Sequence, residues 1–185
     1  KHVTEVAEGL VKRNISVDII TTDPTGLLPP TEEIEGVNIR RFRTIGNDSV
    51  FFISPTLASW LNQHAGQYDL LHAHSYHTPL ALQTAFAARK YRIPFVVTPH
   101  YHGSGHSNFR QLLHIPYRIQ GNWMINQANL IVCVSEAEQT LIHKHFGASL
   151  PTTVIPNGVD LGSLLEAEPF PREGNSKLIL SAGRL

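Results

Sequence analysis

The stretch FVVTPHYHGSGH, residues Phe95–His106, decides how the rest of the chain is organised. It begins with an apolar run of β-branched and aromatic residues, Phe95–Thr98, which is typical of a fully buried strand. The run stops at Pro99 and continues as a loop that carries three histidines and two glycines. A buried strand that ends in a polar, glycine-bearing loop is how an open α/β sheet forms a ligand site, so we expect a ligand here.

Strand-like and helix-like segments alternate along the chain on both sides of this stretch. We predict strands over residues 15–22, 37–42, 69–73, 95–98, 130–134 and 153–155. We predict helices over residues 2–13, from Ser54-Pro55, from Thr78-Pro79 to before Pro94, from Asn108, around Trp123 and from the capping box Ser135–Glu138 to Phe146. Apolar strands alternating with helices indicate an α/β fold with a doubly wound, mostly parallel sheet.

The composition excludes several classes of protein. The 185 residues are 42% hydrophobic and 16% charged, which is typical of a globular chain. Fifteen basic and fifteen acidic residues balance, so no general nucleic-acid-binding field is present. The single cysteine, Cys133, lies in an apolar run, which excludes a disulfide framework and indicates a buried, inert thiol.

The two ends of the sequence suggest a fragment. The chain starts at Lys1 already in a helical pattern and stops at Leu185 just after a predicted strand, so we interpret it as truncated at both ends. We assign residues 1–160 to a first domain. Residues 161–176, rich in Glu, Pro, Gly and Asn, are predicted as a linker, and residues 177–185 as the first strand of a second domain.

Histidines concentrate in the middle of the chain, where seven of the eleven lie between residues 72 and 114. His72 and His74 are two apart on a predicted strand, so both project to one face. With a third ligand from His77, His100 or His102 they could form the metal site of a hydrolase. However, no Asp or Glu occurs between Asp69 and Glu136, and hydrolytic metal sites usually need a carboxylate. We therefore predict no metal, with the histidines lining a cleft.

Six segments in order resemble glycosyltransferase family 4. They are HVTEVAEGLVKRN, DLLHAHS, PFVVTPH, ANLIVCVSEAE, TTVIPNGVD and LILSAGRL. The resemblance implies the GT-B fold, in which two Rossmann-like domains face each other across a cleft. This chain is then most of the N-terminal, acceptor-side domain of an enzyme that transfers a sugar from a nucleoside diphosphate sugar to an acceptor hydroxyl, with retention.

The resemblance also implies which residues form the site. His100 is expected to face the donor sugar as the catalytic residue, and Arg184 to contact the donor diphosphate. The expected substrate-binding residues are His74, His102, Gly103, Asn157 and Gly158. The loop at His102 and Gly103 could cradle a sugar or phosphate, because glycine permits close backbone approach. No metal and no organic cofactor is implied.

The expected partners are the nucleotide sugar, the acceptor and the C-terminal domain, with no nucleic acid. The chain alone is expected to be inactive, because the family's glycine-rich loop and glutamate pair lie outside it. We expect a cytoplasmic protein; Arg40, Arg41 and Arg43 leave peripheral association with the inner face of a membrane as an alternative. The competing functions are the His72/His74/His100 metal-dependent hydrolase and a non-catalytic carbohydrate-binding domain.

Overall fold

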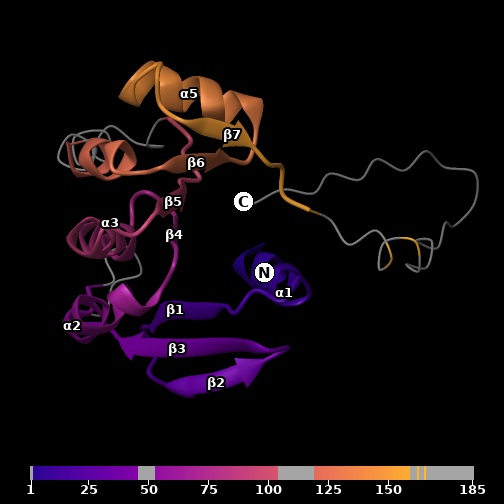
Figure 1. The fold of residues 1–185 in the computed structure, drawn as a ribbon, viewed down its shortest axis with the longest axis vertical. Helices are drawn as coiled ribbons and strands as arrows, with labels where there is room; N and C mark the ends of the chain where they lie inside the picture. The colour runs from indigo at the N-terminus through magenta and orange to yellow at the C-terminus, as the bar shows by residue number, and fades with distance from the viewer. Residues whose placement is uncertain (1, 46–52, 104–118, 159–161, 163–164, 166–185) are drawn as a thin grey trace, which may run out of the picture.

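The computed structural model describes residues 2–45, 53–103, 119–158, 162 and 165. Its strands form two sheets (Figure 1). One sheet has the order β1-β3-β2, from strands β1 (Asp18–Asp23), β2 (Thr31–Ile34) and β3 (Val37–Arg43). The other has the order β4-β5-β6-β7, from strands β4 (Leu71–His74), β5 (Phe95–Thr98), β6 (Leu130–Cys133) and β7 (Thr152–Val154).

The pairing confirms the predicted α/β class. All three pairings of the second sheet are parallel, and so is the pairing of β1 with β3. The antiparallel strand β2, which the sequence analysis did not predict, adds an edge to the first sheet. The prediction of a mostly parallel sheet is therefore confirmed in its strand directions, although the described strands form two sheets.

Helices α1 (His2–Val11), α2 (Pro55–His64), α3 (Pro79–Tyr91) and α5 (Glu136–Phe146) pack around the strands, together with a 3₁₀ turn, η1 (Ala65–Gln67), and helical residues 119–126. In Figure 1, α2 and α3 lie on one side of the strands and α1 lies on the other. The strands are thus covered on both faces, as their apolar composition predicts.

Both predicted Ser/Thr-Pro helix starts are confirmed. The Ser54 hydroxyl accepts a hydrogen bond from the Leu57 amide at 3.3 Å, and the Thr78 hydroxyl accepts one from the Ala81 amide at 3.3 Å. A proline follows each cap, where its missing N–H has no helical acceptor to lose. These caps fix where α2 and α3 begin.

The first strand is shorter at its start than predicted. Asn14 takes a left-handed backbone with φ of 61°, and the amide of Ile15 bonds to the carbonyl of Leu10. These residues therefore close the end of α1, and the strand begins only at Asp18. The helix predicted from Asn108 lies outside the described residues.

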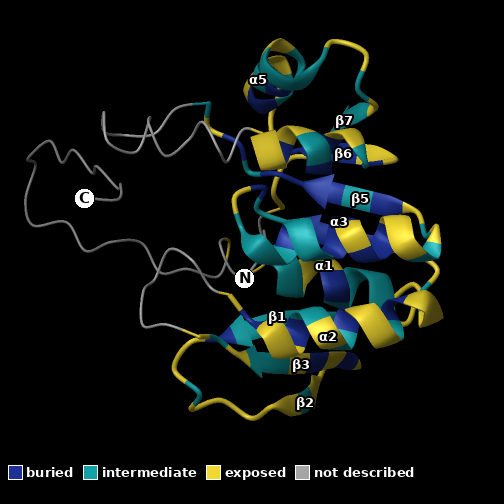
Figure 2. Cartoon of the chain, turned by 90° about the vertical axis from the view of Figure 1, so that its left-hand side faces the viewer, coloured by how far each residue is buried: buried dark blue, intermediate teal, exposed yellow. Residues whose placement is uncertain are grey.

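The larger core forms around β5 and β6. Phe95, Val97 and Ile131 are at most 1% exposed and pack with the apolar faces of the helices. Figure 2 shows β5 mostly buried, whereas α2 and α3 expose one side and bury the other. A smaller core of Ala7, Val37 and Ile39 lies between α1 and β3. The ends of β4 and β5 therefore extend from a buried sheet centre.

Among the described residues, no helix has both the length and the apolar character needed to cross a membrane. The predicted linker over 161–176 and strand over 177–185 lie outside the described residues, apart from 162 and 165. The division into domains therefore stays a prediction.

Candidate active site

The loops that follow β4 and β5 run side by side. Beyond the strands, the amide of Ser75 donates to the carbonyl of Thr98 and the amide of Tyr76 to that of Pro99, both at 2.9 Å. Ser75 and His100 then take left-handed backbones, with φ of 65° and 50°. Such conformations are uncommon for residues with a side chain and often occur at functional sites. Two neighbouring strand ends thus turn sharply at the same edge of the sheet.

His72 and His74 project to one face of β4, as predicted. Their ring centroids are 4.3 Å apart, and His72 Nε2 is 2.8 Å from the hydroxyl of the buried Thr98. Desolvation, and then the neighbouring His72 and His100, lower the pKa of His74 to about 3. Desolvation also lowers the pKa of His72, whose side chain is the more exposed of the two. His74 is therefore a neutral imidazole at pH 7.

The backbone at His100 is held by a buried carboxylate on α5. One oxygen of Glu138 accepts from the amide of Tyr101 at 2.6 Å, and the other accepts from the amide of Val134 at 2.7 Å. The Glu138 amide in turn donates to the hydroxyl of Ser135 at 3.1 Å. The serine half of the predicted capping box is confirmed. The carboxylate half differs, because Glu138 bonds amides of the β6 end and the β5 loop.

Tyr101 is a second anchor of the same loop. It is 3% exposed, and its hydroxyl lies 2.8 Å from Nδ1 of His145. Its ring meets those of Tyr76 and Phe146 edge-on, with each pair of centroids 5.1 Å apart. The loop that carries His100 is therefore packed against α5 on one side and against the β4 loop on the other.

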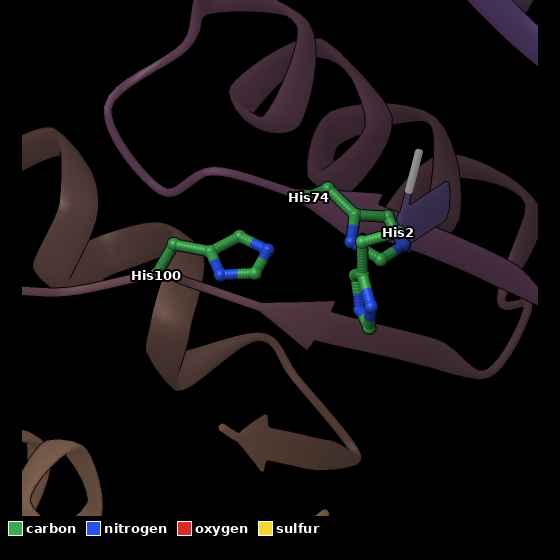
Figure 3. A group of neighbouring side chains, drawn as sticks. All are labelled: His2, His74 and His100. Carbon is green, nitrogen blue, oxygen red and sulfur yellow. The ribbon is translucent and has the colours of Figure 1, made fainter. Parts of the chain in front are cut away.

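His100 is half-buried and faces two other histidines. Its ring centroid is 6.0 Å from that of His74 and 5.7 Å from that of His2, and His2 and His74 are 5.8 Å apart. Figure 3 shows the His100 ring directed toward the other two. Desolvation lowers the pKa of His100; the Glu138 carboxylate opposes this shift, and His2 and His102 add to it. The three rings line one polar position at the edge of the sheet.

The loop beyond His100 divides into an exposed residue and a packed one. His102 is exposed, and its electrostatic effect helps to lower the pKa of His100. Gly103 has φ of +78°, and a Cβ placed on it would lie 3.2 Å from Cδ1 of Leu141 on α5. The backbone conformation and the contact with Leu141 therefore favour glycine at position 103. The side chain of His102 is exposed to solvent.

Among the described residues, no contact links the remaining predicted site residues to the three histidines. Asn157 and Gly158 follow β7 and are exposed, and a Cβ on Gly158 would meet nothing within 4 Å. Arg184 lies outside the described residues. Their roles toward a donor stay predictions.

The single cysteine contributes no nucleophile to this edge of the sheet. Cys133 is fully buried, and desolvation followed by the Glu138 charge raises the pKa of its thiol to about 11. The thiolate is therefore absent at neutral pH. This agrees with the predicted buried and inert thiol.

A separate hollow of about 320 Å³ lies over the β1-β3-β2 sheet, away from both loops. Its lining includes Asp18, Arg40 and Trp60, and the Arg40 guanidinium stands 5.4 Å from the Trp60 ring centroid. None of its lining residues belongs to the β4 or β5 loop. We assign the candidate site to the strand ends, because ligands of α/β sheets bind beyond the carboxyl ends of the strands.

Sequence reasoning missed two residues of this site. The sequence pattern predicts His2 only as part of an amphipathic helix, although a helix N-terminus in an α/β fold lies near the carboxyl edge of the sheet. It predicts Glu138 as a local cap, although a carboxylate one turn into a helix after β6 can reach neighbouring loops. In space, therefore, a carboxylate does lie beside the histidine-rich loop.

Comparison with known proteins gives consistent matches. Residues 1–163 match the model of the family described as Glycosyltransferase Family 4. A D-inositol 3-phosphate glycosyltransferase from Nocardiopsis dassonvillei is 27% identical over 176 residues, covering 86% of this chain and 41% of the relative. A protein of the same name from Streptomyces scabiei is 30% identical over 84 residues, 40% of this chain and 19% of the relative. The chain thus spans less than half the length of these relatives.

Solved structures agree on the fold. Sucrose-phosphate synthase from Thermosynechococcus elongatus superposes with a TM-score of 0.65 at 17% identity, over 86% of this chain and 42% of that chain. Anabaena HepE in complex with UDP and glucose superposes with a TM-score of 0.51 at 24% identity, over 69% of this chain and 33% of that chain. These neighbours have the GT-B fold, and the described residues correspond to part of it.

Proposed function

The chain belongs to glycosyltransferase family 4, whose model matches residues 1–163, and we propose that the full-length protein transfers a sugar from a nucleoside diphosphate sugar to an acceptor hydroxyl. The observation that carries the proposal is the placement of His100. It follows the central strand β5 in a left-handed backbone, and Glu138 holds the amide of the next residue. The sheet therefore presents its imidazole at the edge where ligands of this fold bind.

His100 is the catalytic residue of the proposed reaction. A neutral imidazole has one donor and one acceptor nitrogen, so it can bond a sugar hydroxyl and stabilise charge that develops on the transferring sugar. The lowered pKa of His100 favours this neutral form. His74, neutral and half-buried beside it, is proposed to line the same sugar position.

We propose that the transfer proceeds with retention and without a protein nucleophile. Catalysis then comes from orientation of the two substrates and from electrostatic stabilisation of the leaving diphosphate. His102, Gly103, Asn157 and Gly158 are proposed to contact substrate, and Arg184 to offset diphosphate charge. The proposed step uses no metal ion and no organic cofactor.

A phosphorylated polyol is the first acceptor to test. The curated relatives are named for inositol 3-phosphate, although this chain covers less than half of their length. These names support a phosphorylated polyol as the acceptor class. They do not name the donor nucleotide or sugar, which a donor screen has to identify.

The experiment is a donor and acceptor screen on the purified full-length protein. We expect release of nucleoside diphosphate together with a new glycoside. The variant His100→Ala should lose roughly 100- to 1,000-fold in kcat, the effect of removing one preorganised charge-stabilising group. The matched control is His64→Ala on α2, where the ring stacks on Trp60 outside the candidate site. His64→Ala should keep wild-type turnover.

Unchanged turnover in His100→Ala would remove this residue from the reaction. The two alternative functions, a metal-dependent hydrolase and a non-catalytic carbohydrate-binding domain, are not favoured by the comparisons. A hydrolase would release free sugar without glycoside, and a binding domain would retain sugar without turnover. Either result would overturn the proposal.

A further inference from the structure

Three histidines from separate parts of the fold converge at the candidate site. His2 comes from the first turn of α1, His74 from the last residue of β4, and His100 from the loop after β5. One imidazole nitrogen of each lies within 4.8 Å of the others (Figure 3). The trio differs from the sequence-based hydrolase set, because His2 replaces His72, whose Nε2 lies instead against the Thr98 hydroxyl.

One nitrogen of the trio lacks a partner that a metal ion could supply. His74 Nδ1 is buried and has no hydrogen-bond partner among the described residues. A buried polar atom without a partner is costly, and a metal bond to this nitrogen would relieve that cost.

The geometry is close to that of a coordination sphere. Zinc–nitrogen bonds of about 2.0–2.1 Å in a tetrahedron bring ligand nitrogens to roughly 3.3 Å from one another. The nitrogens lie within 4.8 Å of one another, so they have to approach by at most about 1.5 Å. His2 is half-buried in the terminal turn of α1, so its side chain can move more easily than that of His74 on the sheet. The His100 imidazole can approach by side-chain rotation, while its backbone stays anchored.

We propose that His2, His74 and His100 form a binding site for a divalent first-row transition ion such as Zn²⁺. Three imidazoles suit zinc, copper or nickel, and they leave at least one coordination position open. The ion is not proposed to be hydrolytic. Both oxygens of Glu138, the buried carboxylate nearby, already accept backbone N–H groups, so it is not available as a general base.

The site has a consequence that rests on the proposed function. If His100 contacts the transferring sugar, an ion bound to its nitrogen occupies the same position. Metal and donor are then mutually exclusive, and zinc inhibits transfer competitively with the nucleotide sugar. Micromolar chelator restores the rate.

The test is a titration of the tag-free, chelator-treated full-length protein with Co²⁺, followed by displacement with Zn²⁺. We expect one visible absorption band that saturates at one ion per chain. The variants His2→Gln, His74→Gln and His100→Gln should each weaken binding by more than the roughly 10- to 100-fold that loss of an outer partner causes. The control variant His64→Gln should bind as the wild type does.

Several results would overturn the site. These are a titration without a band, a His2→Gln variant with wild-type affinity, or equal loss in His64→Gln. Because His2 is half-buried in a terminal turn, His2→Gln should fold normally, and a thermal melt without metal checks this. Zinc binding without inhibition would refute the competition with the donor while the site stands. An inactive protein that still binds one ion would refute the proposed function alone.

Discussion

The most informative single substitution is Glu138→Gln. Glu138 is 4% exposed, and its two oxygens accept the amides of Tyr101 and Val134 at 2.6 and 2.7 Å. Glutamine keeps one acceptor oxygen but turns an NH₂ group toward the other amide. The variant therefore loses one charge-assisted hydrogen bond, about 1.5–3 kcal/mol, and leaves one buried N–H without a partner. We expect a total loss of about 2–4 kcal/mol.

Hydrogen exchange measures this effect where it occurs. Amides of Tyr101 and Val134 should exchange at least roughly 30-fold faster in Glu138→Gln, which corresponds to about 2 kcal/mol of local stability. The matched control is Glu136→Gln, because Glu136 lies in the same first turn of α5 but is exposed. It should lose at most about 0.3–1 kcal/mol of interaction with the helix dipole.

The outcome also bears on His100, the residue before Tyr101. The Glu138 charge raises the pKa of His100 against the effect of desolvation, so its removal should lower that pKa further. An NMR titration of the His100 ring measures this pKa in Glu138→Gln and in the control Glu136→Gln. Equal exchange rates and equal His100 titration in the two variants would refute the role assigned to Glu138.

Three further predictions concern packing, protonation and capping. Gly103→Ala should lose about 1–2 kcal/mol in urea unfolding, because φ is +78° and Leu141 Cδ1 would lie 3.2 Å away, whereas Gly158→Ala should change stability by less than about 0.5 kcal/mol. The pKa of His74 is about 3 in the folded protein, so below about pH 6.5 the unfolded chain binds a proton at this residue that the folded protein does not bind. The unfolding free energy should therefore fall by about 2 kcal/mol from pH 7 to pH 5, and His74→Gln should abolish that part of the pH dependence. Thr78→Ala removes the α3 cap and should lower the unfolding free energy by about 1 kcal/mol. An unchanged unfolding free energy would show that the cap bond does not form in solution.

Much of the fold follows from local chemistry. Thr78-Pro79 starts α3 and Phe95–Thr98 is β5 at the predicted bounds, because a cap with proline and a continuous apolar run have few other solutions. Strand β2 was missed, since TEEI has weak strand propensity and forms through its antiparallel pairing with β3. Its formation depends on a partner distant from the local pattern.

The site was only partly predictable for the same physical reason. His74 and His100 lie on neighbouring strand ends, which the α/β pattern brings together, so their approach could be foreseen. His2 and Glu138 arrive from helices packed against that edge, and the position of a helix relative to a sheet depends on tertiary packing. The separation of Asp69 and Glu136 along the sequence therefore did not measure how near a carboxylate lies in space.

The left-handed backbone of His100 sets a trade-off between robustness and activity. A residue with a side chain in this conformation is disfavoured by roughly 1–2 kcal/mol, and glycine at the same position would be free of that penalty. Selection for thermal resistance alone would thus favour replacing the imidazole on which the proposed chemistry depends. Stabilised versions of this protein are better sought at α2 and α3, whose exposed faces lie away from the strand ends.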